Sequence, residues 1–270
     1  MRISSATRRM GKFDRILLAT DWDGTFYRGK VFEENIRALK YFEENGGKFT
    51  VCSGRNFDFI KAFKDTVPIN TYVSCFNGAY IADFECGKVL YQGFCDSHLF
   101  DIIDNIIDSE LRFTEINIFD DKCDKPFILC FDEYKKIKDS FRNNNIYKIL
   151  LRMENSDIGF YNAKEVNKME LYDYLAVRSW ETGLELFRIS NSKGAAIKRI
   201  AEAAGCKLVV AVGDYENDID MIKAADIGYA VENAVDALKS VADRHTVSVT
   251  ESAIAKIIYD IERDVDNNLI

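Results

Sequence analysis

The stretch ILLATDWDGT, residues 16–25, decides how this chain folds and what chemistry it can perform. Its first half is an apolar run typical of a buried strand, and its second half places two carboxylates at the end of that strand. Extended backbone sends alternate side chains to opposite faces, so Asp21 and Asp23 can face one way while Trp22 faces the other. Two negative charges this close are costly without a cation, and carboxylate oxygens suit Mg2+. The stretch therefore predicts a magnesium site beside an aspartate that can attack phosphorus.

Three later segments offer what such a nucleophile needs. The strand-like run Phe49–Cys52 ends in SGR at 53–55, where a hydroxyl and backbone N–H groups can bind a phosphate oxygen. Lys193 precedes a helical pattern and can bring a positive charge to a phosphoryl group. The run Leu208–Val212 leads into GDYEND at 213–218, so a third apolar strand also ends in acids.

Together these motifs resemble those of the haloacid dehalogenase superfamily of phosphotransferases, and in particular its Cof-type group with a large α/β cap (type IIB). The order DWDGT, SGR, Lys193, GDYEND is the order of that superfamily, and Asn77-Gly78-Ala79 matches a turn of the group. The motifs cover residues 15–83 and 188–250, while the middle matches nothing, as expected for a variable cap. Each motif alone could be a turn, a helix cap or a solvated lysine, but these readings leave the clustering of acids at strand ends unexplained.

We expect an α/β protein with a Rossmann-like parallel-sheet core domain, residues 1–83 and 188–270, and an inserted α+β cap domain, residues 84–187. Alternating strand and helix patterns at both ends of the chain favour a parallel sheet, whose ligands bind at the carboxyl ends of the strands. The middle reads as a mainly antiparallel sheet with helices, one of them near Lys164–Tyr174. The candidate hinges are Asp83–Cys86 and Glu185–Arg188.

The resemblance also implies a role for each motif residue. Asp21 would be the nucleophile, and Asp23 would be the acid and base, so Asp23 must start protonated through burial or a nearby like charge. The carboxylate of Asp21, the main-chain carbonyl of Asp23 and the carboxylate of Asp214 would bind Mg2+. The phosphate or substrate contacts would come from Ser53, Gly54, Lys193 and Asn217, and the supporting residues would be Asp218 and Thr25.

These roles predict a Mg2+-dependent phosphatase that hydrolyses sugar phosphates or similar small metabolites through an aspartyl-phosphate. A phosphomutase of the same superfamily stays open, because some mutases share both DxDGT and a similar cap. A catalytically idle sensor of a phosphorylated ligand is a further alternative. A receiver domain would lack the acid and base at Asp23 and any large insert.

Composition limits the partners of the chain. With 270 residues and 47% hydrophobic residues the chain can form two domains, and its net charge of −8 disfavours nucleic-acid binding. No apolar stretch has the length of a membrane span, and the basic leader Met1–Lys12 lacks the apolar segment of a secretory signal. The 7 cysteines are scattered without a CxxC pair, which favours free thiols in a reducing cytosol. We expect a cytoplasmic monomer or weak homodimer that binds a small phosphorylated metabolite but neither nucleic acid nor membranes.

Overall fold

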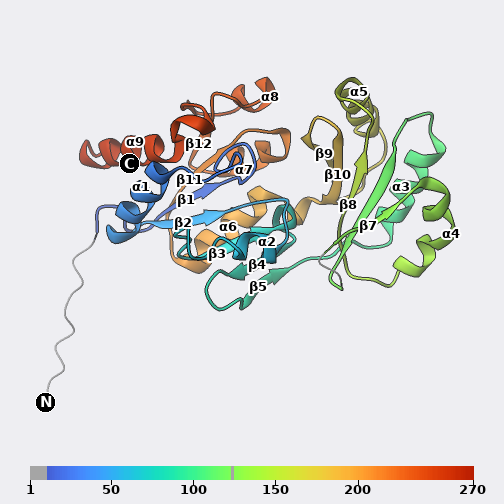
Figure 1. The fold of residues 1–270 in the computed structure, drawn as a ribbon, viewed down its shortest axis with the longest axis horizontal. Coiled ribbons are helices and arrows are strands. Elements are labelled where there is room, and N and C mark those ends of the chain that lie inside the picture. The colour runs from blue at the N-terminus through green and yellow to red at the C-terminus, as the bar shows by residue number, and fades with distance from the viewer. Residues whose placement is uncertain (1–10, 123–124) are drawn as a thin grey trace, which may run out of the picture.

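The structure, a computed structural model, describes residues 11–122 and 125–270, and these form two lobes with separate hydrophobic clusters (Figure 1). The larger one, the core lobe, contains both ends of the described chain, and the smaller one, the cap lobe, is formed by its middle. Arg2, Arg8 and Arg9 of the basic leader and Cys123 lie outside the described residues. The six other cysteines are free. Among the described helices, none is both long and apolar enough to cross a membrane.

A five-stranded parallel sheet lies at the centre of the core lobe, in the order β13-β12-β11-β1-β2. The strands are β1 Ile16–Thr20, β2 Lys48–Val51, β11 Leu208–Gly213, β12 Ile227–Ala230 and β13 Arg244–His245. In register, Leu17 lies beside Val209 and Leu18 beside Val210, so each face of the sheet carries a row of apolar side chains. The parallel sheet expected from the alternating patterns is confirmed.

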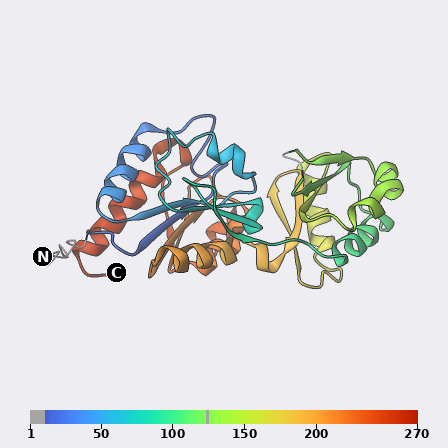
Figure 2. The same ribbon diagram turned by 90° about the horizontal axis from the view of Figure 1, so that it is seen from below.

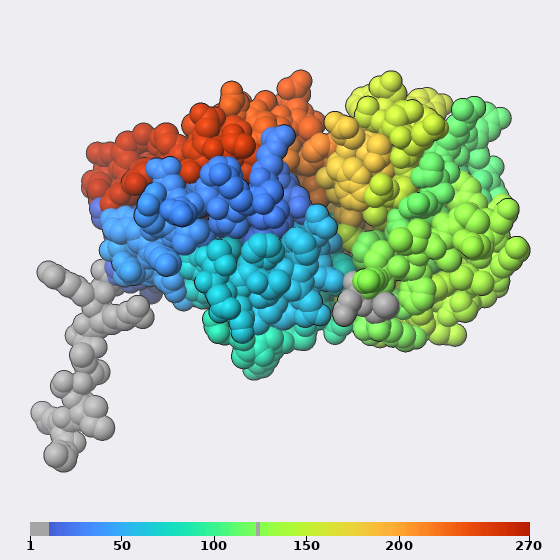
Figure 3. Space-filling model, in the orientation of Figure 1, coloured from blue at the N-terminus to red at the C-terminus, as the bar shows by residue number. Residues whose placement is uncertain are grey.

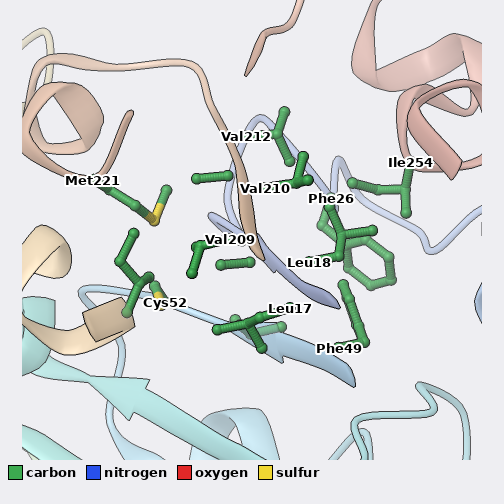
Figure 4. Packing of buried hydrophobic residues seen from close by; sticks show 14 of the residues in the cluster. Leu17, Leu18, Phe26, Phe49, Cys52, Val209, Val210, Val212, Met221 and Ile254 are labelled. Atoms are coloured by element: carbon green, nitrogen blue, oxygen red, sulfur yellow. The ribbon is translucent and has the colours of Figure 1, made fainter. Parts of the chain in front are cut away.

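Helices cover both faces of this sheet (Figure 2). The helices α1 Glu33–Glu44 and α9 Ala253–Asp266 pack together on one face, and α6 Lys193–Ala204 and α7 Ile219–Ala224 pack together on the other. The short helices are α2 Phe57–Lys61 and α8 Asp236–Lys239. Figure 4 shows Leu18, Val210 and Ile254 on one side of the strands and Leu17, Val209 and Met221 on the other. This two-sided burial explains why the strands read as continuous apolar runs.

A small antiparallel sheet, β3-β4-β5, adjoins the parallel one. Its strands are β3 Tyr72–Cys75, β4 Tyr80–Asp83 and β5 Val89–Gln92, and a single bridge between Cys52 and Ser74 links it to the end of β2. The sequence reading had β3 continuing the parallel alternation and Asp83–Cys86 as a hinge. The bridge between Cys52 and Ser74 is parallel, so β3 does follow β2 in the parallel direction, but β3 also pairs antiparallel with β4. Asp83–Cys86 is part of the turn from β4 to β5 rather than a hinge.

The cap lobe is built on a second five-stranded sheet, β7-β6-β8-β10-β9, in which every pair is antiparallel. The strands are β6 Glu115–Asp120, β7 Phe127–Leu129, β8 Ile146–Arg152, β9 Tyr174–Trp180 and β10 Gly183–Arg188, and the helices are α3 His98–Asp108, α4 Phe131–Phe141 and α5 Ser156–Val166. Phe94 packs against the core-lobe cluster, and Cys95 packs against the cap-lobe cluster. We keep the division into a catalytic core and a cap as a proposal, with its first boundary near Phe94 rather than at residue 84.

The helix expected near Lys164–Tyr174 is misplaced, since α5 spans Ser156–Val166. Its start is fixed by Asn155, whose side chain accepts a hydrogen bond from the backbone N–H of Ile158 and so caps the first turn. Its buried face consists of Gly159, Asn162, Ala163 and Val166. A face with one glycine and one asparagine gives little hydrophobic periodicity, so the N-cap was the only strong signal.

Candidate active site

The strands β1 and β11 end side by side and bring carboxylates together there. Asp21 follows β1 and donates its backbone N–H to Val212 (3.0 Å), and Asp214 follows β11. Oxygens of Asp21, Asp214 and Asp218 lie within 4.8 Å of one another. Gly24, at φ +88, allows the loop after β1 to approach Asp214, because a Cβ there would lie 2.4 Å from the Oδ2 of that residue. Asp21 and Asp214, which are far apart in the sequence, therefore belong to one cluster of carboxylates.

Lys193 supplies the positive charge of this cluster. Its fully buried Nζ donates to Asp21 Oδ1 (2.5 Å) and to Asp218 Oδ1 (2.6 Å). The second oxygen of Asp218 accepts from the backbone N–H groups of Asp214 (3.0 Å) and Tyr215 (3.2 Å). Asp218 therefore orients both Lys193 and the turn that carries Asp214, while Thr25 Oγ1 donates to Asp214 Oδ1 (2.6 Å).

Burial and neighbouring charge shift the pKa values of the cluster. Burial raises the pKa of Asp21, with Asp218 and Asp214 adding to the rise and Lys193 opposing it. Burial likewise raises the pKa of Asp214 to about 7, and the charge of Asp218 contributes. Burial disfavours the charged form of Lys193, but Asp21 and Asp218 raise its pKa above the ordinary value. Three carboxylates against one ammonium leave negative charge without compensation in the cluster.

A divalent cation fits this imbalance. The donors are carboxylate oxygens, which suit Mg2+, and the hydrogen bonds to Lys193 and Thr25 leave one oxygen each on Asp21 and Asp214 for a cation. Asp218 has both oxygens engaged, so it is better suited to a supporting role. The side chain of Asp23 lies outside this three-carboxylate cluster, which leaves its main-chain carbonyl as its contribution to a metal site.

We expect Mg2+ to raise the melting temperature more at pH 8 than at pH 6. Because the folded-state pKa of Asp214 is raised to about 7, the metal-free fold is stabilised by a proton at low pH and loses this stabilisation as pH rises from about 4 through 7. The ionised carboxylate can then bind Mg2+ without releasing a proton. Thermal unfolding with and without Mg2+ at pH 6, 7 and 8 measures the difference. An equal shift at all three pH values would contradict a titrating ligand at this site.

The predicted phosphate-binding residues lie around one cavity of about 760 Å³ between the two lobes. Asp21, Asp23, Ser53, Gly54 and Asn217 all line it. Lys193 is fully buried and does not line the cavity, but its Nζ donates to Asp21, which does. The structure thus brings the motif residues together at the carboxyl ends of the parallel strands, as the sequence predicted for ligands of such a sheet.

The cap lobe forms the opposite wall of this cavity. Its lining residues are apolar, aromatic, cationic and, in two cases, polar or acidic, and they are Phe119, Lys125, Pro126, Lys148, Leu150, Arg152, Ser179, Trp180 and Glu185. Figure 3 shows the two lobes in contact along this boundary. The guanidinium of Arg152 lies 5.4 Å from the centre of the Trp180 ring. The cap lobe therefore presents apolar, aromatic and charged side chains to the cavity.

Arg55 is a site residue to which sequence reasoning gave no role. Its Nε donates to Asp23 Oδ2 (2.8 Å) and its Nη2 to Asp23 Oδ1 (3.0 Å). We expected Asp23 to be buried or near a like charge, but its side chain is 48% exposed and its closest charged partner is a cation. The available signal was the position of Arg55 in the SGR motif and of Phe59 four residues later, since the guanidinium lies 4.7 Å from that ring.

Comparisons with known proteins agree over nearly the whole chain. The model of the haloacid dehalogenase-like hydrolases matches residues 18–258. The phosphatase YwpJ of Bacillus subtilis is 29% identical, with 90% of this chain and 98% of the relative covered. The pyridoxal phosphate phosphatase YbhA of Escherichia coli is 26% identical, with 90% of this chain and 97% of the relative covered.

Solved structures show the same two-lobe fold. A haloacid dehalogenase-like hydrolase from B. subtilis superimposes with a TM-score of 0.75 at 25% identity, with 90% of this chain and 98% of the other covered. A sugar phosphatase of haloacid dehalogenase subclass IIB superimposes with a TM-score of 0.71 at 20% identity, with 91% and 99% covered. The second likeness concerns the fold alone.

Proposed function

Because this chain belongs to the haloacid dehalogenase-like hydrolases and is a Cof-type phosphatase, a hydrolase acting on phosphate esters, we propose that it is Mg2+-dependent and hydrolyses small phosphate monoesters through an aspartyl-phosphate on Asp21. The observation that carries this proposal is the position of Asp21, which lines the cavity while bonded to the buried Lys193 and next to Asp214. A nucleophilic carboxylate needs positive charge beside it to approach a phosphate. Lys193 supplies one positive charge, and Asp214 can hold a cation that supplies more.

In the first step Asp21 attacks phosphorus, a bond forms from its carboxylate oxygen, and the bond to the ester oxygen breaks. Lys193 offsets the negative charge of the approaching groups. The Ser53 hydroxyl and the backbone N–H groups of its turn hold phosphoryl oxygens. When bound, Mg2+ offsets the repulsion between carboxylate and phosphate. Asn217, which lines the same cavity, contacts the phosphate or the substrate.

Asp23 moves the protons in both steps. It gives a proton to the leaving ester oxygen, and it then takes one from the water that cleaves the aspartyl-phosphate, which frees Asp21 and releases phosphate. In the structure both oxygens of Asp23 accept hydrogen bonds from Arg55, so this contact has to open before Asp23 carries the proton that it gives to the ester oxygen. The proton balance closes, because Asp23 ends each cycle as it began.

The size of the cavity, about 760 Å³, and its mixed lining support a metabolite larger than phosphate itself. The relative YbhA is named a pyridoxal phosphate phosphatase, and a protein that shares the fold of this chain is named a sugar phosphatase. We propose sugar phosphates or comparable small metabolites as substrates of a cytoplasmic enzyme, with nucleic acids and membranes excluded as partners.

A phosphate-release screen tests this function. The panel contains sugar phosphates, nucleotides, pyridoxal 5′-phosphate and flavin mononucleotide, with no bisphosphate present. We expect release from at least one monoester, a drop of about a hundredfold or more with EDTA, and recovery with added Mg2+, because the carboxylate cluster loses its countercharge.

Activity that survives complete metal removal would contradict the metal-assisted reaction. Turnover that appears only when a bisphosphate is added would favour a phosphomutase instead. Binding of a phosphorylated ligand with no turnover in Mg2+ would favour the idle sensor.

A further inference from the structure

A buried ion pair lies on the face of the cap sheet that borders the cavity. Lys148 on β8 and Glu185 on β10 bind each other, and each side chain is only 3% exposed. Neighbouring positions 149, 151, 184 and 186 belong to the hydrophobic cluster of the cap lobe. A buried ion pair is often no more stabilising than well-packed apolar residues, so the pair calls for a reason beyond the folding of the cap.

Each member of the pair has a second partner in the core lobe. The Nζ of Lys148 donates to the backbone oxygen of Gly54 (2.9 Å), and the side-chain amide of Asn77 donates to Glu185. Gly54 belongs to the phosphate-binding turn that follows β2. The pair therefore bridges the boundary between the lobes through one donor and one acceptor.

Asn77 lies in a turn that contacts three parts of the active site. Its backbone N–H donates to Ser53 O (2.9 Å), and its side-chain oxygen accepts from Asn217 (3.4 Å). The next residue, Gly78 at φ +120, lies against the segment before Lys193, since a Cβ at 78 would come within 2.5 Å of Ser192 O. A group that fixes Asn77 thus acts on the Ser53 turn and on Asn217 together.

We propose that Lys148 and Glu185 are positioning residues: when the cap closes, the pair docks on Gly54 and Asn77 and fixes the Ser53–Gly54 turn and Asn217 for phosphoryl transfer. This inference rests on the proposed function. When the cap opens, Lys148 and Glu185 keep each other as partners, and the core-lobe groups exchange their cap partners for water. The phosphate site is then held less tightly until closure, so its assembly coincides with the exclusion of water.

The substitution Asn77→Asp tests the docking contact with one atom changed. It replaces the amide donor by a carboxylate oxygen that faces Glu185, and it keeps the oxygen that accepts from Asn217. We expect kcat/KM to fall about tenfold or more, because a buried hydrogen bond becomes a repulsion only when the lobes meet. Small-angle scattering should show a larger radius of gyration than for the unmodified chain.

The double variant Asn77→Asp/Glu185→Gln reverses donor and acceptor across the boundary. The glutamine amide can donate to the new carboxylate, and its oxygen can still accept from Lys148. We expect kcat/KM to return to within about threefold of the value for the unmodified chain, because the docking bond is restored. The radius of gyration should return to that of the unmodified chain. Asn143→Asp, which adds the same charge at an exposed cap position, is the matched control and should change neither.

A loss that persists in the folded double variant, or an Asn77→Asp variant as active and compact as the unmodified chain, would overturn the proposal. Circular dichroism establishes folding for each variant. If the unmodified chain hydrolyses no monoester, the proposed function fails, while the scattering of the three variants still tests the docking contact independently.

Discussion

Replacing Asp21 with asparagine should abolish phosphate release and leave the fold intact. An amide oxygen cannot displace an alcohol from phosphorus, so we expect a loss of about ten-thousandfold or more in kcat. The asparagine has the same shape and can still accept the hydrogen bond from Lys193. It also removes a buried charge that lies near Asp214 and Asp218, so the metal-free protein should be no less stable.

Initial rates under saturating Mg2+ measure the loss of phosphate release, and circular dichroism measures whether the fold is intact. Asp132→Asn, at an exposed position on the first turn of α4, is the control for the same chemical change and should keep full activity. A rate for Asp21→Asn within tenfold of the unmodified chain would mean that another group attacks phosphorus.

The core-lobe side of this active site could be predicted from the sequence, because each of its motifs is a local pattern. Apolar runs followed at once by acids specify strands whose ends carry carboxylates, and parallel pairing brings those ends together. The bulky Trp22 between the two acids faces away, as alternation requires, and is fully buried beside Phe26 and Tyr27. The α1 helix, Glu33–Glu44, is likewise specified locally, by its apolar spacing and by the glycines that follow it.

The contacts that reach across the two lobes could not be predicted in this way. Lys148 and Glu185 are separated by 37 residues, and Asn77 and Glu185 by 108, so no local spacing relates them. A lysine within an apolar strand reads as a solvated side chain, since lysines are seldom buried. No local spacing relates Arg55 to Asp23 either, because their bond depends on how two loops from different strands approach each other.

Replacing Lys193 with methionine should cost both activity and stability. The side chain is fully buried between Asp21 and Asp218, so its removal leaves two carboxylates without their cation. Breaking a buried ion pair from one side costs about 3–5 kcal/mol of unfolding free energy, and we expect a loss of that size in metal-free urea unfolding. Activity should fall about a thousandfold or more where the variant is still folded, because phosphate would face uncompensated negative charge. Lys198→Met, at an exposed position of the same helix, should change the unfolding free energy by less than about 0.5 kcal/mol.

Combining the two substitutions distinguishes charge from packing at Lys193. Asp21→Asn removes one of the two carboxylates that the methionine leaves without a cation, so the double variant should regain part of the lost stability and none of the activity. Mg2+ should stabilise Lys193→Met more than it stabilises the unmodified chain, because the ion can offset the carboxylates that the lysine no longer neutralises. If neither Asp21→Asn nor Mg2+ reduced the loss, the lysine would act through its packing alone, and its charge could not be what prepares Asp21 for attack.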